Sequence, residues 1–104
     1  MAEAGPTGPT SPTEQELLAA LDKVAVADVL VQALATSVSI GFRRVSEEVR
    51  DLPQARLAIE SLRALEPVLR ENGVEDALVR DLEQARANLQ LAYASAVAET
   101  SAEG

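Results

Sequence analysis

The sequence predicts an all-α domain of three helices, in which a long apolar N-terminal helix packs on an antiparallel C-terminal αα-hairpin. Three observations support this fold class. Thirteen of the 19 residues from 24 to 42 are Ala, Val, Leu, Ile or Phe, and the stretch carries a single charge, Asp28. Two later segments, 55–69 and 78–96, repeat Ala and Leu at alternating three- and four-residue spacings, which place them on one face of a helix. Between these segments stands Asn72-Gly73, and Gly supplies the left-handed residue with which many helices end.

The first helix has a clear start signal. Thr13 and Glu16 fit a capping box, in which each side chain accepts a hydrogen bond from the other residue's backbone N–H. We expect the helix to run from there without a break to about Phe42. Arg43 and Arg44 then lie at its C-terminal end, where positive charge suits the helix dipole.

The apolar surface of this helix extends around most of its circumference. An ordinary surface helix has an apolar stripe a little over ~100° wide, and here the arc is roughly twice that. Polar side chains fall within one narrow sector: Asp28, Gln32, Thr36, Ser39 and Arg43. Small residues within the apolar arc would let another backbone approach closely: Ala27, Ala33, Ser37 and Gly41. Such a helix must be covered on more than one side.

We therefore expect the chain to self-associate, with a dimer favoured. A chain of 104 residues buries only a modest share of its surface, and small domains gain stability by oligomerising. The candidate interface lies along the first helix, with some members in the chain's own core instead: Val26, Leu30, Leu34, Val38 and Phe42. Asp28 and Gln32, one turn apart, either mark the solvent edge, which we favour, or form a buried polar pair in a helical interface.

The second helix is expected to begin after Asp51, a capping residue, with Pro53 in its first turn. Pro67 is expected to bend it or end it early, because proline removes one backbone donor and crowds the preceding turn. Its apolar stripe, widened by Ile59, consists of Ala55, Ala58, Leu62, Leu65 and Leu69.

The third helix is expected to begin near residues 74–76. Its seam consists of Leu78, Leu82, Ala85, Leu89, Ala92 and Ala96. Tyr93 lies beside this seam, and we expect a core position with the hydroxyl at the rim. The outward faces carry oppositely charged residues at spacings that form weak pairs within one helix: Arg56–Glu60, Asp76–Arg80 and Glu83–Arg86.

These elements divide the chain into three parts. Residues 1–12 are rich in Pro and Thr and are predicted to form a disordered tail. Residues 13–98 form the helical domain, and residues 99–104 form a short polar tail. The N-terminal residues lack the basic region and apolar core of a signal peptide, so a cytoplasmic protein is expected.

The composition excludes several classes of function. The formal charge is −8, with nine basic and 17 acidic residues, which argues against nucleic acid or an anionic membrane as a partner. The chain has no Cys and no His, which removes thiolate chemistry and the commonest general base and metal ligand. No phosphate-binding loop or nucleophile elbow is present. We expect no enzymatic activity, no cofactor and no metal.

Residues 24–42 are nearly long enough to span a membrane, because about 20 apolar residues are enough to cross a bilayer. Each Val, Leu, Ile or Phe gains only about 0.3–0.6 kcal/mol at a helix centre, whereas a central Asp costs about 2.5–3.5 kcal/mol. Asp28 is off-centre, so the sum is marginal, and the composition favours a helix buried in protein.

Residues 51–94, together with the apolar helix before them, resemble the bacterial family known as domain of unknown function 1844. The matching residues in the second helix are Leu52, Ala55, Arg56, Ile59, Glu60 and Leu62. Those in the third helix are Leu89, Leu91 and Tyr93. The chain departs from the family in its shorter first connection and in having Asn88 or Gln90 where an Arg is usual. The resemblance implies a small soluble helical protein and supplies no activity.

The sequence thus favours a non-catalytic interaction or scaffold module that binds a second copy or another protein through its helical surface. Two alternatives stay open. One is a membrane-linked accessory protein with residues 24–42 inserted in the bilayer. The other is a carrier of a small apolar ligand held between the helices.

Overall fold

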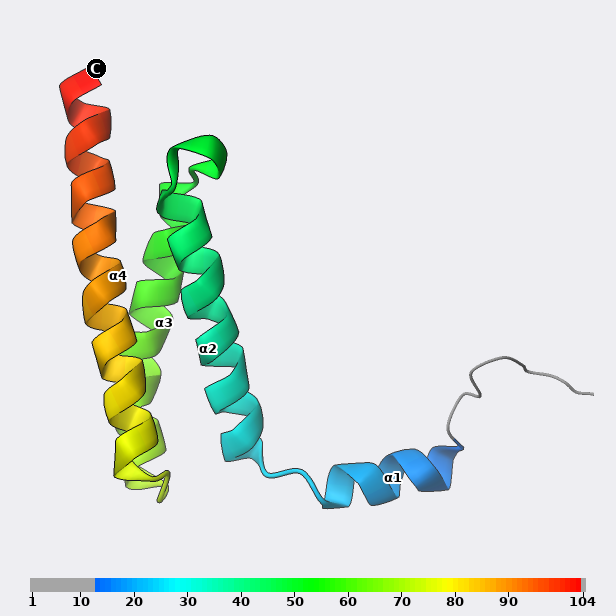
Figure 1. Ribbon diagram of the computed structural model, residues 1–104. Helices are drawn as coiled ribbons and strands as arrows, with labels where there is room; N and C mark the ends of the chain where they lie inside the picture. The colour runs from blue at the N-terminus through cyan, green and yellow to red at the C-terminus, as the bar shows by residue number, and fades with distance from the viewer. Residues whose placement is uncertain (1–12, 104) are drawn as a thin grey trace, which may run out of the picture.

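The computed structural model describes residues 13–103, which are helical apart from short connections and contain no strand. The elements are α1 (Glu14–Asp22), α2 (Val26–Val45), a short 3-10 turn η1 (Glu47–Val49), α3 (Leu52–Glu71) and α4 (Asp76–Glu103) (Figure 1). The all-α prediction is confirmed, but three helices is the wrong number. The predicted tail of residues 1–12 lies outside the described residues.

The predicted first helix is divided into α1 and α2. The capping box at its start is confirmed, because Thr13 Oγ1 accepts from the Glu16 N–H at 3.1 Å and Glu16 Oε1 accepts from the Thr13 N–H at 2.8 Å. The helix then ends at Asp22, and Ala25 adopts an extended conformation with φ −88° and ψ 137°.

The division has a physical reason that the sequence shows only weakly. Residues 23–25 hold no Gly or Pro, but Val24 and Val26 are β-branched and lower the helix propensity of this stretch. α1 also contacts no other helix, so no packing holds it in line with α2. Helical order in proteins depends mostly on such packing.

Helices α2, α3 and α4 pack side by side, while α1 points away from them (Figure 1). α3 and α4 form the predicted antiparallel hairpin, and α2 lies alongside it in contact with both helices. The main core joins all three helices: Leu34, Leu62, Leu69, Val79 and Leu82. A second cluster lies farther along the hairpin, where Val45 and Tyr93 pack against Ala58, Ile59 and Leu89.

The seam of α4 differs from the prediction at one end. Leu82, Leu89 and Ala96 are buried as expected, but Leu78 is 44% exposed and Val79 is fully buried in its place. Ala85 and Ala92 of the predicted seam are half-buried, and so are Arg86 and Tyr93 beside them. The inward face of α4 is therefore wider than the predicted seam.

Gly41 marks the closest approach of α2 to the hairpin. A Cβ at this position would lie 2.7 Å from Leu89 Cδ2 and 3.3 Å from Ala58 Cβ. Of the small residues predicted to admit a close approach, Gly41 does so, and the side chains that lie against it belong to the chain's own hairpin.

The ends of the hairpin helices follow their local signals, except at Pro67. Asp51 Oδ1 accepts from the Gln54 N–H at 3.4 Å, and Gly73 adopts φ +82°. α3 continues through Pro67 to Glu71, so of the two effects expected of this proline, a bend or an early end, the early end is wrong. α4 runs on to Glu103, so the predicted polar tail is helical over residues 99–103.

The charged pairs of the hairpin confirm two predictions and correct a third. Arg56 pairs with Glu60 at 2.8 Å and Arg80 with Asp76 at 2.9 Å. The predicted Glu83–Arg86 pair is wrong. Each of these residues instead pairs with α3, Glu83 with Arg70 at 3.0 Å and Arg86 with Glu66 at 2.8 Å. Pairing between the helices replaces pairing along one helix because both side chains face the neighbouring helix.

Candidate interaction surface on helix α2

Helix α2 buries very little of itself against its own chain. Of its 20 residues, only Leu34 and Gly41 are buried. Val26 is 73% exposed and Val29 53%, while Ile40 and Phe42 are 46% and 39% exposed. A single exposed apolar residue is common, but a row of them along one helix indicates a surface that binds something.

The five predicted interface residues divide between the core and the surface. Leu34 lies in the chain's own core at 3% exposure, and Leu30 and Val38 are half-buried against that core. Val26 and Phe42 are exposed. The structure thus leaves only the two ends of the predicted set free to contact a partner.

A different row of α2 residues lies on the exposed surface of the helix, along its border with α3. All five are exposed and are called the outer seam below: Val26, Val29, Ala33, Thr36 and Ile40. The predicted interface contains Val26 but not the other four residues. Their spacing of three and four residues is visible in the sequence, but Thr36 interrupts the row with a polar side chain, so the row does not stand out as an apolar stripe.

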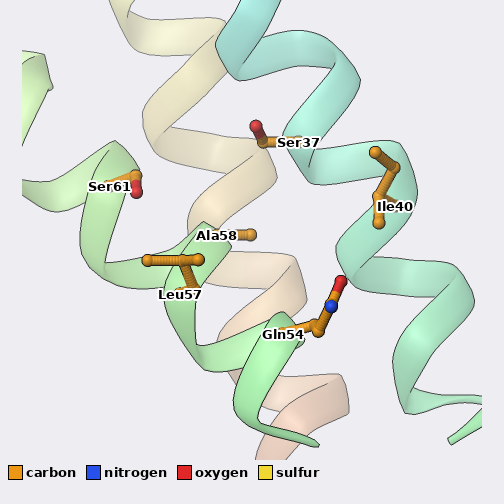
Figure 2. Close-up of a pocket in the computed structure, with 6 residues that line it drawn as sticks. All are labelled: Ser37, Ile40, Gln54, Leu57, Ala58 and Ser61. Atoms are coloured by element: carbon orange, nitrogen blue, oxygen red, sulfur yellow. The ribbon is translucent and has the colours of Figure 1, made fainter. Parts of the chain in front are cut away.

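A shallow groove of about 240 Å³ runs beside the outer seam, between α2 and α3 (Figure 2). Ile40 of α2 and Leu57 of α3 stand on its two sides, and the buried Ala58 lies between them. Leu57 is 64% exposed. The remaining lining residues are Ser37, Gln54 and Ser61. The groove therefore extends the apolar surface of α2 onto α3.

The polar residues of α2 flank this surface. Asp28 and Gln32 are both exposed in the single chain. Arg43 is exposed and lies 3.9 Å from Glu48, whereas Arg44 donates from Nη1 to the Val49 carbonyl oxygen at 3.3 Å. Arg44 therefore holds η1 against the end of α2, consistent with a structural role for this arginine.

The ion pairs of the hairpin are already engaged in holding α3 to α4. Glu66 is 4% exposed and accepts from Arg86 Nε at 2.8 Å, while Arg86 Nη1 donates to Gln90 Oε1 at 2.9 Å. The hydrogen bond from Arg86 to Glu66 raises the pKa of the Arg86 guanidinium. The hydrogen bond from Arg70 lowers the pKa of Glu83.

The carboxylates in the rest of the described chain do not form a cluster. In residues 13–103 no three acidic side chains gather closely enough to hold a metal ion. Glu47 and Glu48 lie exposed on η1, and Asp76 is engaged with Arg70 and Arg80. The main surface feature that these charged residues do not explain is therefore the exposed apolar surface of α2.

Among the helices of the described residues, α2 alone is long and apolar enough to cross a membrane by length and composition. The core helix of a soluble protein has the same properties. Most of the surface of α2 is left uncovered by the rest of the chain, so whatever covers it must come from outside the chain.

No family model, curated protein or solved structure matches the chain. The resemblance to the family of unknown function therefore stays a prediction.

Proposed function

We propose that the protein is a small non-catalytic interaction or scaffold module that self-associates through α2. The observation that carries the proposal is the row of large apolar side chains left exposed on this helix, with Val26 at 73% and Val29 at 53%. Burying apolar surface is favourable by about 25 cal/mol per Å². A second copy brings the same apolar face and can cover it, as in the common two-fold dimer of small proteins.

Helix α1 supports the same proposal. Leu17, Leu18 and Leu21 are 51%, 54% and 65% exposed, and no residue of α1 is buried. A helix of nine residues is marginal on its own in water, so α1 gains order from a surface that the single chain does not supply. A second copy provides such a surface.

The proposal is tested by placing a charge on the exposed part of α2. We expect Val29→Asp to weaken self-association by about 100-fold, because two Val side chains per dimer lose about 1.5 kcal/mol each. The change leaves the single chain folded, since an acidic residue near the start of a helix is favoured by the helix dipole. Sedimentation equilibrium measures the association and circular dichroism checks the helix content.

Leu91→Asp is the matched control. Leu91 is 71% exposed on α4, so it carries the same change in chemistry away from α2. We expect this variant to associate as the wild type does. If both substitutions weaken self-association equally, or if neither weakens it, the result would contradict an interface on α2.

A membrane-linked accessory protein is the second candidate, and the length and apolar composition of α2 favour it. Cell fractionation separates the two. A scaffold module is recovered in the soluble fraction without detergent, whereas insertion of α2 predicts that the protein stays with the membranes after an alkaline carbonate wash.

A further inference from the structure

The outer seam of α2 has the spacing of a helix-pairing seam. Its residues follow one another at intervals of three, four, three and four, and Arg43 continues the series by three. Two helices whose apolar residues repeat in this way interlock side chains along their length. The seam is exposed throughout, while a different face of α2, with Leu34 and Gly41, is buried against the hairpin.

We propose that α2 pairs in antiparallel orientation with α2 of a second copy, outer seam against outer seam. The inference rests on the proposed self-association and specifies its geometry. The intervals between the residues of the seam are almost the same when read in either direction along the helix. An antiparallel pair therefore places Val29 opposite the partner's Ile40. The same register places Ala33 opposite the partner's Thr36.

The sizes of the side chains fit this register. The small residues Ala33 and Thr36 meet at the centre of the pair, where they let the two helix axes approach closely. Larger residues, Val29 and Ile40, meet on both sides of the centre and fill the wider space there. Packed helices lie about 8–10 Å apart, and the side chains at the contact set the value within that range.

The charges at the two ends of α2 select the antiparallel orientation. The first turn carries Asp28 and the last turn carries Arg43 and Arg44. A parallel pair would place Arg43 beside the partner's Arg43, which costs free energy. An antiparallel pair brings each basic end to the acidic end of the partner and also opposes the two helix dipoles.

The groove between α2 and α3 lies where the partner helix passes. In the antiparallel register the start of the partner's α2 crosses the Ile40 end of the outer seam, next to Leu57 (Figure 2). This contact covers Leu57, which is 64% exposed in the single chain. The two-fold symmetry repeats the contact at the other end.

The chain has no cysteine, so single cysteines can report which residues face one another. Val29→Cys and Ile40→Cys are prepared separately, one of them with a mass tag, unfolded together, refolded and oxidised. We expect a covalent species of twice the 11.0 kDa chain mass, plus the tag, in the mixture. Neither variant alone should form a covalent dimer. In this register residue 29 of one chain lies about 16 Å along the helix axis from residue 29 of its partner, which is beyond the reach of a disulfide.

Each result bears on the inference. A disulfide-linked dimer of Val29→Cys alone indicates a parallel pair and overturns the orientation. If the protein forms a non-covalent dimer but the mixture of Val29→Cys and Ile40→Cys forms no disulfide, the interface lies elsewhere. That result overturns the inference but leaves the proposed self-association in place. A wild-type monomer overturns both. As a control, Val29→Cys mixed with Arg63→Cys, exposed on the far side of α3, should give no covalent dimer.

Discussion

Gly41 decides how closely α2 lies on the hairpin. Its missing side chain leaves room for Leu89, which is fully buried, and for Ala58. A methyl group at this position would fall 2.7 Å from Leu89 Cδ2. Because Leu89 is enclosed, it has little space into which to move.

Gly41→Ala is therefore expected to destabilise the fold by about 1 kcal/mol. Overpacking a core costs about 1–3 kcal/mol, and the better helix propensity of Ala returns about 1 kcal/mol. Urea unfolding at one fixed protein concentration measures the change. Ser39→Ala, at an exposed position of the same helix, serves as the control and should stay within about 0.5 kcal/mol of wild type. A more stable Gly41→Ala protein would contradict the close contact.

Glu66 and Arg86 show what sequence patterns miss at the level of single residues. Apolar periodicity assigns the inward face of a helix to Ala and Leu, so a glutamate buried to 4% exposure on α3 has no signal in that pattern. Its burial depends on an arginine 20 positions later. Only the pairing of the two helices brings these charges together.

At the scale of the elements, this pair joins α3 to α4. Removing one partner of a buried ion pair costs much more free energy than replacing both partners, because it leaves the other charge buried alone. We expect Arg86→Met to destabilise the fold by about 3 kcal/mol. The double variant Glu66→Met/Arg86→Met should recover most of that loss. Additive effects of the two single substitutions would show that the residues do not interact.

The Arg70–Glu83 pair, which also joins α3 to α4, predicts a pH dependence. The hydrogen bond from Arg70 lowers the pKa of Glu83 below its ordinary value of 4.5. A carboxylate with a lowered pKa stabilises the fold above its ordinary pKa, and this contribution disappears as the pH falls through the lowered value. Glu83→Gln should therefore reduce the urea midpoint at pH 7 and have no effect at strongly acidic pH. The same loss at both pH values would contradict the assignment.

The local signals of the sequence predicted some element boundaries well and others poorly. Thr13, Asp51 and Gly73 act within a few residues of where they stand, and each produces the cap or turn expected of it. The division between α1 and α2 has no such signal in residues 23–25. It arises because α1 lacks a packing partner, which is a property of the whole fold.

At the scale of the whole molecule, the sequence predicted that one helix was too apolar for its companions to cover. The structure agrees that the hairpin covers only one side of α2. The side it covers could not be read from the helix alone, because apolar residues occur around most of its circumference. Leu34 therefore belongs to the core and Val29 to the surface, although both are apolar residues of the same helix.

Sedimentation equilibrium of the wild-type protein over a range of concentrations tests the account most directly. We expect a reversible dimer with twice the 11.0 kDa chain mass, because only association covers the outer seam. A protein that stays monomeric at high concentration, with full helix content and without detergent, would contradict self-association through α2.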